Sequence, residues 1–115
     1  SKNYFFVYEI NSEIGGYIIL LVRSNSNVGR VYSLAVSEKY RGMGVGRKLM
    51  LFSEESMYNS GRKSIKLEVS VKNTIAISLY TSLGYSNTRL LHQYYSDGTS
   101  AHEMKKILKK FENRA

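Results

Sequence analysis

A cluster of glycines between two arginines is the part of this sequence whose residue types most directly suggest chemistry. The segment reads Arg41-Gly42-Met43-Gly44-Val45-Gly46-Arg47 and joins a β-branched stretch to a stretch with helical periodicity. Glycine allows positive φ and lets a ligand approach the backbone closely. Successive exposed N–H groups at the start of a helix bind anions, and the two arginines add positive charge. We therefore expect this turn to bind a pyrophosphate.

Two common pyrophosphate-binding loops do not match this turn. A P-loop continues Gly-Lys-Ser/Thr, whereas this chain continues Gly46-Arg47-Lys48-Leu49. A dinucleotide-binding fingerprint requires G-x-G-x-x-G. The last position of that pattern falls on Arg47 when it starts at Gly42, and on Leu49 when it starts at Gly44. The sequence therefore excludes both loops.

Glu68 and Tyr80 are the side chains best suited to proton transfer. Glu68 stands inside an apolar stretch, where burial would make its carboxylate a stronger base. Tyr80 follows Asn73 by about two helical turns, so that both share one helix face and can line one cleft. The structural alternatives are an exposed strand glutamate for Glu68, a core aromatic for Tyr80 and a simple helix N-cap for Asn73.

Tyr94 and Tyr95 form a second candidate group. They follow an apolar stretch and precede the turn Ser96-Asp97-Gly98. On a strand their rings would point to opposite faces, so that only one could face a ligand. Its hydroxyl could hold an acceptor backbone, and the alternative is a pair of sheet aromatics.

The hydrophobic pattern predicts the elements that would position these residues. Alternating residues favour strands over 4–10, 17–22, 30–36, 64–71, 85–95 and 101–109, and helical spacing favours helices over 45–59 and from Asn73 to Gly84. The expected apolar stripes are Val45, Leu49, Phe52, Ser56 and Met57 in the first helix, and Ile75, Ala76, Leu79, Tyr80 and Leu83 in the second. Residues 111–115 form a charged tail.

The element order β-β-β-α-β-α-β-β predicts the fold class. It favours an α/β (α+β) fold, with a mixed, mostly antiparallel sheet, a central βαβ crossover and flanking helices. The chain of 115 residues suits a single domain over 1–115.

Composition limits the possible functions. The chain has 17 Lys and Arg against nine Asp and Glu, a net charge of +8 and no cysteine. Disulfides, thiolate zinc sites and a cysteine nucleophile are therefore excluded. Only His92 and His102 remain as histidine ligands, so we expect no metal. The basic surface attracts anions, which include polyphosphate cofactors, nucleic acid and ribosome surfaces.

The sequence contains no targeting or membrane segment that can be recognised. No apolar run approaches the roughly 18 residues of a membrane span, and Ser1-Lys2-Asn3-Tyr4 does not read as a signal peptide. We expect a soluble, cytoplasmic protein that does not associate with membranes.

Three segments carry a resemblance to a known family. The segment from Val36 to Gly46 resembles the acyl-coenzyme A signature of the GNAT superfamily, Arg/Gln-x-x-Gly-x-Gly/Ala, with Arg41, Gly44 and Gly46 at its fixed places. Residues 67–85, and Tyr-Tyr-Ser-Asp-Gly at 94–98 with the Ala and Met that follow, are similar to the branch that acetylates protein N-termini. That branch includes the RimI type, which acetylates ribosomal proteins. The resemblance covers residues 7–108.

The resemblance implies an acetyl-coenzyme A (acetyl-CoA)-dependent N-acetyltransferase that transfers the acetyl group directly to a protein or peptide α-amine. Acetyl-CoA would be a co-substrate, with its pyrophosphate on the N–H groups of Arg41 to Arg47. Its pantetheine arm would lie along the strand that contains Leu34 and Val36, and against Asn73. Glu68 would act as the base through water, Tyr80 would protonate the CoA thiolate, and Tyr94 or Tyr95 would hold the peptide.

The sequence departs from the family pattern at three places. Ser70 replaces the usual Arg after Leu-Glu-Val, and Thr99-Ser100 replaces an acidic pair. The chain also starts at what resembles the second strand of the family. We therefore expect either a truncated form or a form whose acceptor site is completed by another chain.

Three alternative functions remain open on the sequence. They are a small-amine acetyltransferase of the same fold, a non-catalytic CoA-binding domain and a nucleic-acid-binding module. Nucleic acid is the less favoured partner, because the aromatic residues are not interleaved with basic residues in an RNA-recognition pattern.

Overall fold

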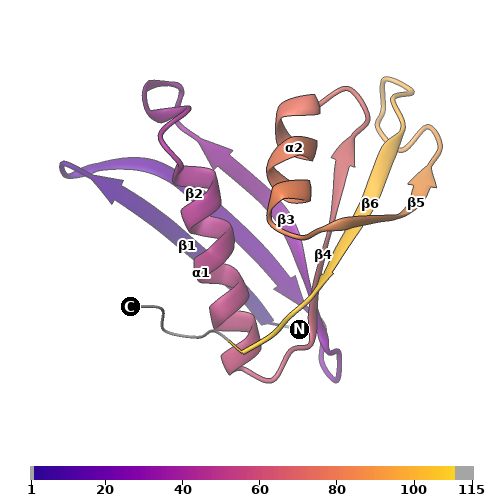
Figure 1. The fold of residues 1–115 in the computed structure, drawn as a ribbon, viewed down its shortest axis with the longest axis horizontal. Coiled ribbons are helices and arrows are strands. Elements are labelled where there is room, and N and C mark those ends of the chain that lie inside the picture. The colour runs from indigo at the N-terminus through magenta and orange to yellow at the C-terminus, as the bar shows by residue number, and fades with distance from the viewer. Residues whose placement is uncertain (1, 111–115) are drawn as a thin grey trace. The chain divides into compact units, whose positions relative to one another are not determined.

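The computed structural model describes residues 2–110 and contains six strands and two α-helices (Figure 1). The elements are β1 Lys2–Ile10, β2 Glu13–Val22, β3 Val28–Val36, the 3-10 turn η1 Glu38–Tyr40, α1 Val45–Asn59, β4 Ser64–Ser70, α2 Thr74–Ser82, β5 Ser86–Leu91 and β6 Ala101–Ile107. The expected order of strands and helices is confirmed. The predicted charged tail lies outside the described residues.

The chain divides into two compact units. The first unit comprises residues 1–65 and 107–115, and the second comprises Lys66–Lys106. Strands β1, β2 and β3 form an antiparallel ladder in the first unit, whereas the second unit carries the order β4-β6-β5 with β5 and β6 antiparallel. The predicted mixed α/β class, with mostly antiparallel strand pairing and two helices, is confirmed.

In the first unit, α1 packs across the β1–β3 ladder (Figure 1). Leu49, Met50 and Met57 on the helix are buried, as are Ile18 and Leu20 on β2. A Cβ at Gly16 would lie 2.8 Å from the carbonyl oxygen of Ala35 and 3.0 Å from Cγ1 of Val45. The absence of a side chain at Gly16 therefore lets the first turn of α1 lie directly on β2.

The buried face of α1 differs from the predicted stripe. Phe52 is 56% exposed, whereas Ser53 and Glu54 are buried. The small Ser53 allows close packing of the helix, while Phe52 lies at its flank and makes an edge-to-face contact with Phe6 at 5.0 Å between ring centroids. The predicted burial of Val45, Leu49 and Met57 is confirmed, and that of Phe52 is wrong.

Strand β4 shows the predicted alternation. Ile65, Leu67 and Val69 are buried, whereas Lys66, Glu68 and Ser70 are half-buried on the other face. The burial predicted for Glu68 is therefore only partial, because its apolar neighbours in sequence lie on the opposite face of β4.

Asn73 is the N-cap of helix α2, as predicted. The side-chain Oδ1 of Asn73 accepts a hydrogen bond from the Ala76 N–H at 3.1 Å, which is the usual N-cap geometry. Tyr80 and Leu83 are buried, but Ile75 is 85% exposed and does not belong to an apolar stripe.

The strand predicted over 85–95 is too long. Strand β5 ends at Leu91, and Gln93 follows with a φ of 49°. The Tyr95 N–H donates to the Thr99 carbonyl at 3.0 Å, which closes a loop instead of extending a strand. The high strand propensity of tyrosine misled the sequence prediction. Strand β6 also ends earlier than predicted, at Ile107.

Candidate functional site

The glycine turn of the first unit has an open backbone. Gly42 and Gly44 adopt φ values of 79° and 80°, and a Cβ on either residue would meet no atom within 4 Å. Glycine is thus required at both positions for its left-handed conformation and not for internal packing. Gly44 is also the N-cap of α1. The open space above this backbone leaves room for a ligand.

The N–H groups that follow form the start of α1. The first helical bond runs from the Lys48 N–H to the Gly44 carbonyl at 3.0 Å. The preceding N–H groups at the start of a helix have no partner within it, and the helix dipole places partial positive charge there. Val45 and Gly46, the first residues of α1, contribute N–H groups of this kind. The start of α1 can therefore bind an anion, as the sequence predicted.

Arg41 and Met43 take different positions around this turn. The Arg41 N–H donates to the Glu38 carbonyl at 3.3 Å, and its side-chain Nε donates to the Val36 carbonyl at 3.4 Å. Arg41 thus folds back over the end of β3, where Leu34 and Val36 are half-buried. Met43 is 58% exposed. Because the Arg41 N–H already donates to Glu38, the backbone N–H groups that can bind an anion begin after Arg41.

A polar cluster that was missing from the sequence prediction lies just before the turn. The Tyr40 hydroxyl donates to Glu13 Oε2 at 2.6 Å, and Lys39 Nζ lies 3.0 Å from the same oxygen. The hydrogen bond from Tyr40, and then that from Lys39, lower the pKa of the Glu13 carboxyl. The same bond raises the pKa of Tyr40. No sequence pattern links these residues, because β2 and β3 separate them along the chain.

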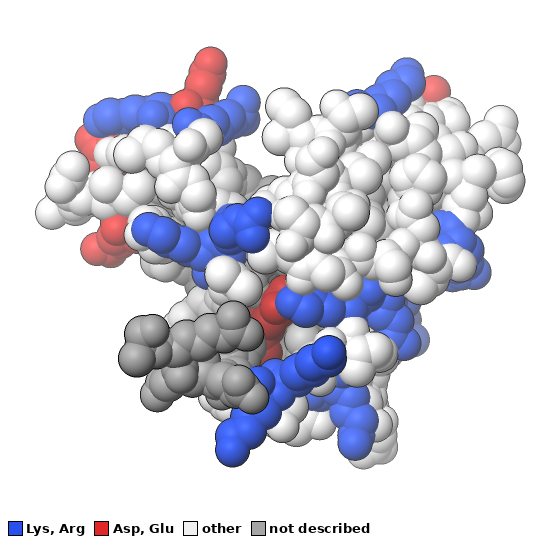
Figure 2. Space-filling model, in the orientation of Figure 1, with Lys and Arg blue, Asp and Glu red and all other residues white. Residues whose placement is uncertain are grey.

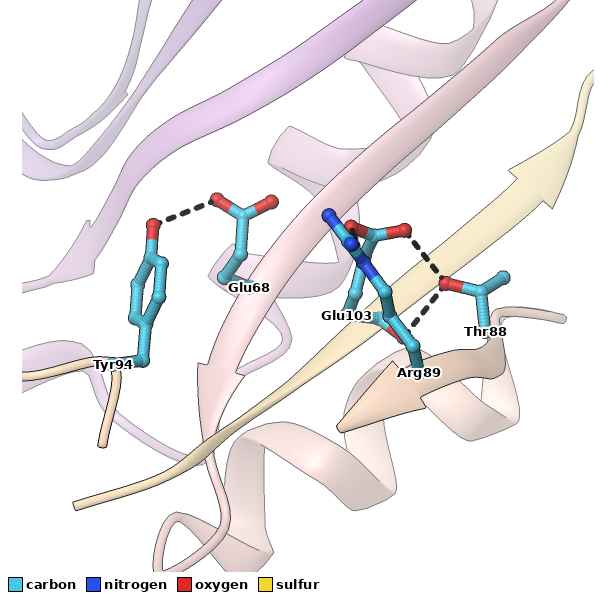
Figure 3. A network of polar contacts seen from close by, with 5 residues as sticks. All are labelled: Glu68, Thr88, Arg89, Tyr94 and Glu103. Carbon is cyan, nitrogen blue, oxygen red and sulfur yellow. Dashed lines mark hydrogen bonds and ion pairs between the residues drawn. The ribbon is translucent and has the colours of Figure 1, made fainter. Parts of the chain in front are cut away.

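In the second unit, the structure brings Glu68, Tyr94 and Tyr95 together. The Tyr94 hydroxyl donates to Glu68 Oε1 at 3.4 Å (Figure 3). The rings of Tyr94 and Tyr95 meet edge to face, with centroids 5.0 Å apart. The prediction that they point to opposite faces of a strand is wrong, because both lie in the loop after β5. Burial, with smaller effects of Tyr94 and Glu68, raises the pKa of Tyr95.

Tyr80 belongs to the same group of side chains. It is 7% exposed, and its ring centroid lies 6.0 Å from that of Tyr85. Burial is the main effect that raises the pKa of Tyr80, and the charge of Tyr95 is the second. Its phenol is therefore held in the protonated form that a proton donor requires. Asn73 lies at the start of the same helix.

A second polar network of this unit involves residues that were not predicted. Glu103 accepts hydrogen bonds from Thr88 Oγ1 at 2.9 Å and from Arg89 Nε at 3.0 Å (Figure 3). The bond from Thr88 is the main effect that lowers the pKa of Glu103. The network joins β5 to β6. Its residues belong to two strands that meet only in the fold, so no sequence motif marks it.

Comparison with known families identifies the chain. The model of the acetyltransferase (GNAT) family matches residues 1–85, which is most of the chain. The chain belongs to the GNAT family. Within the described residues, no three or more His, Asp or Glu side chains gather as a metal site would require. No helix in residues 2–110 has both the length and the apolar character of a membrane span.

Similar curated proteins include N-terminal acetyltransferases. The GNAT chain is 38% identical over 113 residues to the N-alpha-acetyltransferase of Sulfurisphaera tokodaii, covering 87% of this chain and 66% of that protein. It is 34% identical to the N-terminal acetyltransferase A complex catalytic subunit of Arabidopsis thaliana, covering 91% of this chain and 57% of that protein. The chain thus spans about two thirds or less of the length of these relatives.

Solved structures show the same fold. The similarity to Ard1 from Thermoplasma volcanium has a TM-score of 0.86 at 33% identity, over 92% of this chain and 71% of that one. The ribosomal-protein-S18-alanine N-acetyltransferase from Escherichia coli gives 0.85 at 25% identity, over 98% and 74%. A nourseothricin acetyltransferase gives 0.85 at 28% identity, over 93% and 66%. The GNAT fold therefore extends over nearly the whole chain.

Proposed function

We propose that this GNAT chain is an acetyl-CoA-dependent N-acetyltransferase that acetylates the α-amino group of a protein or peptide. The observation that carries the proposal is the glycine turn with two left-handed residues at the start of α1, in a chain of the GNAT family. The names of the archaeal and plant relatives support an N-terminal acceptor.

The first unit would bind acetyl-CoA through its pyrophosphate. The N–H groups that follow Arg41, through Met43 and up to Arg47, would hold the phosphate oxygens, with positive charge from the helix start. The open backbone at Gly42 and Gly44 fits this ligand, since any Cβ there would occupy the space beside the N–H groups. Leu34 and Val36 would contact the pantetheine arm, as the family resemblance implies.

The second unit would supply the groups that move protons. Acetyl-CoA provides an acetyl thioester, so that a neutral amine can take the acetyl group as the carbon–sulfur bond breaks. Glu68 would accept the proton of the amine, through a water molecule, and Tyr80 would donate a proton to the departing thiolate. The buried, protonated phenol of Tyr80 suits that role.

Tyr94 and Tyr95 would position the acceptor. Tyrosine offers a hydroxyl for the peptide backbone and a ring for an apolar side chain. The bond from Tyr94 to Glu68 keeps the proposed acceptor contact next to the proposed base. Both rings would then influence peptide binding, because they touch each other.

A small amine is the second candidate acceptor. The similarity to a nourseothricin acetyltransferase, at a TM-score of 0.85, is the observation that favours it.

A partner chain is also part of the proposal. The plant relative is a subunit of a complex by its name, which supports the proposal that another chain contributes to the acceptor site. A cytoplasmic location stays a prediction from the sequence.

A side-by-side acceptor assay tests the proposal. The purified chain is incubated with acetyl-CoA and either a panel of unblocked peptides or a panel of small amines, and products are measured by mass spectrometry. We expect acetylated peptides and little product from small amines. Product from small amines alone would replace the peptide acceptor with the second candidate.

A further inference from the structure

The start of β2, next to the turn that follows β1, contacts the segment that precedes the proposed pyrophosphate site. Glu13 accepts a hydrogen bond from the Tyr40 hydroxyl at 2.6 Å and forms an ion pair with Lys39. The Gly15 carbonyl accepts the Ser37 N–H at 2.8 Å. A Cβ at Gly15 would also lie 3.5 Å from the Tyr40 ring, so the ring rests against this glycine. This end of the β1–β2 hairpin, at residues 13–15, thus contacts η1 and the residue before it through both side chains and backbone.

The same hairpin end contacts the segment that follows the site. Gly16 lies beneath the first turns of α1, and a Cβ there would be 3.0 Å from Val45 Cγ1 and 3.2 Å from Leu49 Cδ1. Between η1, which ends at Tyr40, and α1, which begins at Val45, only residues 41–44 remain. The short glycine-rich segment is therefore held at both ends by one hairpin.

We propose that Glu13 and Tyr40 are positioning residues for acetyl-CoA, which hold the glycine turn in the conformation that binds pyrophosphate. The inference rests on the proposed function and adds two residues, neither of which touches the ligand. Unrestrained glycines sample many backbone conformations, and ordering such a segment costs binding free energy. A turn fixed beforehand at Tyr40 avoids part of that cost.

The exposure of this cluster separates positioning from a general role in stability. The side chains of Lys39 and Glu13 are 66% and 52% exposed, and exposed ion pairs contribute little to the free energy of unfolding. Tyr40 itself is buried at 6% exposure, but replacement by phenylalanine keeps its ring. Loss of the hydrogen bond should therefore affect ligand affinity more than the melting temperature.

Calorimetric titration with two ligands tests the inference. Acetyl-CoA reports the whole site, and ADP reports a pyrophosphate without pantetheine. We expect Tyr40→Phe and Glu13→Ala to raise both dissociation constants about tenfold, equal to ~1.4 kcal/mol. Glu13→Gln keeps an acceptor oxygen for Tyr40 and should retain most of the affinity. The double variant should lose no more than the worse single variant, because the two residues share one contact.

Glu103→Ala is the matched control. It removes a carboxylate that also accepts bonds from a hydroxyl and a cation, here Thr88 and Arg89. Both dissociation constants should stay within about twofold of the unmodified chain, since ~0.4 kcal/mol corresponds to that factor. Turnover at saturating acetyl-CoA should be unchanged in the Tyr40 and Glu13 variants.

Two different failures can be told apart. If the unmodified chain binds acetyl-CoA but Tyr40→Phe and Glu13→Ala bind it equally well, the positioning role is wrong and the proposed function stands. Equal losses of affinity in the Glu103→Ala control would also overturn the positioning role. If the unmodified chain binds neither acetyl-CoA nor ADP, the proposed function itself fails.

Discussion

Tyr80 combines burial with a raised pKa, and both favour a protonated phenol at neutral pH. Replacement by phenylalanine keeps the ring in the core and removes the hydroxyl. We expect Tyr80→Phe to lower kcat by about 10²-fold, within the usual range for loss of a general acid. The dissociation constant of acetyl-CoA should change little. Steady-state kinetics with a separate binding titration measure the two effects, and full turnover would remove Tyr80 from the mechanism.

The raised pKa of Tyr80 also predicts a pH dependence of stability. Its ordinary pKa is 10.0, and burial raises it in the folded chain. As the pH rises past that ordinary value, the unfolded chain loses this proton before the folded chain does. The free energy of unfolding should therefore be unaffected by Tyr80 below about pH 10 and fall above it. Denaturant titrations between neutral and alkaline pH should show a smaller fall for Tyr80→Phe, and identical curves would contradict the shift.

Tyr94 and Tyr95 should act as a pair. Their rings are in contact, and Tyr94 also binds Glu68. We expect Tyr94→Phe and Tyr95→Phe each to raise the KM for peptides, by up to about tenfold for one hydrogen bond of ~1.4 kcal/mol. Residues in contact couple energetically. The free-energy change calculated from the KM of the double variant should therefore differ from the sum of the changes in the two single variants. Additive effects in a double-mutant cycle would show that the two rings act independently.

The glycine turn offers a test with an internal control. Gly44 and Gly61 both have positive φ, at 80° and 91°, and a Cβ on either would meet no atom within 4 Å. Gly44→Ala and Gly61→Ala should therefore destabilise the fold by similar amounts, about 1 kcal/mol each. Only Gly44→Ala should weaken acetyl-CoA binding, because Gly61 lies after the far end of α1.

The outcome is read from melting temperatures with and without acetyl-CoA. A ligand at 100 times its dissociation constant stabilises by roughly 2.7 kcal/mol, and this gain should be lost in Gly44→Ala and kept in Gly61→Ala. Equal gains in both variants would place the pyrophosphate elsewhere.

Elements with strong local signals could be predicted from the sequence. Helix α1 has the predicted bounds, because glycines stand at its start and after its end. Asn73 caps α2 as its residue type suggested, and the alternation of β4 separates Glu68 from Leu67 and Val69. The start of α1 and the position of Glu68 on β4 could thus be located from local rules.

Features that depend on distant contacts could not be predicted. Phe52 has the hydrophobicity of a core residue, but the packing of α1 on β2 leaves it at the flank. The loop that brings Tyr94 and Tyr95 together depends on bonds to Thr99 and Ser100. The contact of Glu13 with Tyr40 likewise joins segments that meet only after the hairpin folds.

The charge of the whole chain suits an anionic ligand. The net charge is +8, and basic side chains outnumber acidic ones on the face shown in Figure 2. Such a surface raises the local concentration of anions and speeds their association. Acetyl-CoA carries several phosphate charges, so its association rate should fall as salt concentration rises. Exposed charges alone would not create the specificity that we propose for the glycine turn.

Transfer of an acetyl group to an α-amine is the most direct test of the account. The chain is incubated with acetyl-CoA and one of two peptides of equal sequence, one with a free α-amine and one blocked there but containing a free lysine. The amount of CoA thiol released is measured, and the position of the acetyl group on the peptide is determined by fragmentation in the mass spectrometer. The account predicts one CoA thiol per acetylated peptide, with the acetyl group on the α-amine of the unblocked peptide. Absence of thiol release above that of buffer, or release without α-acetylation, would contradict it.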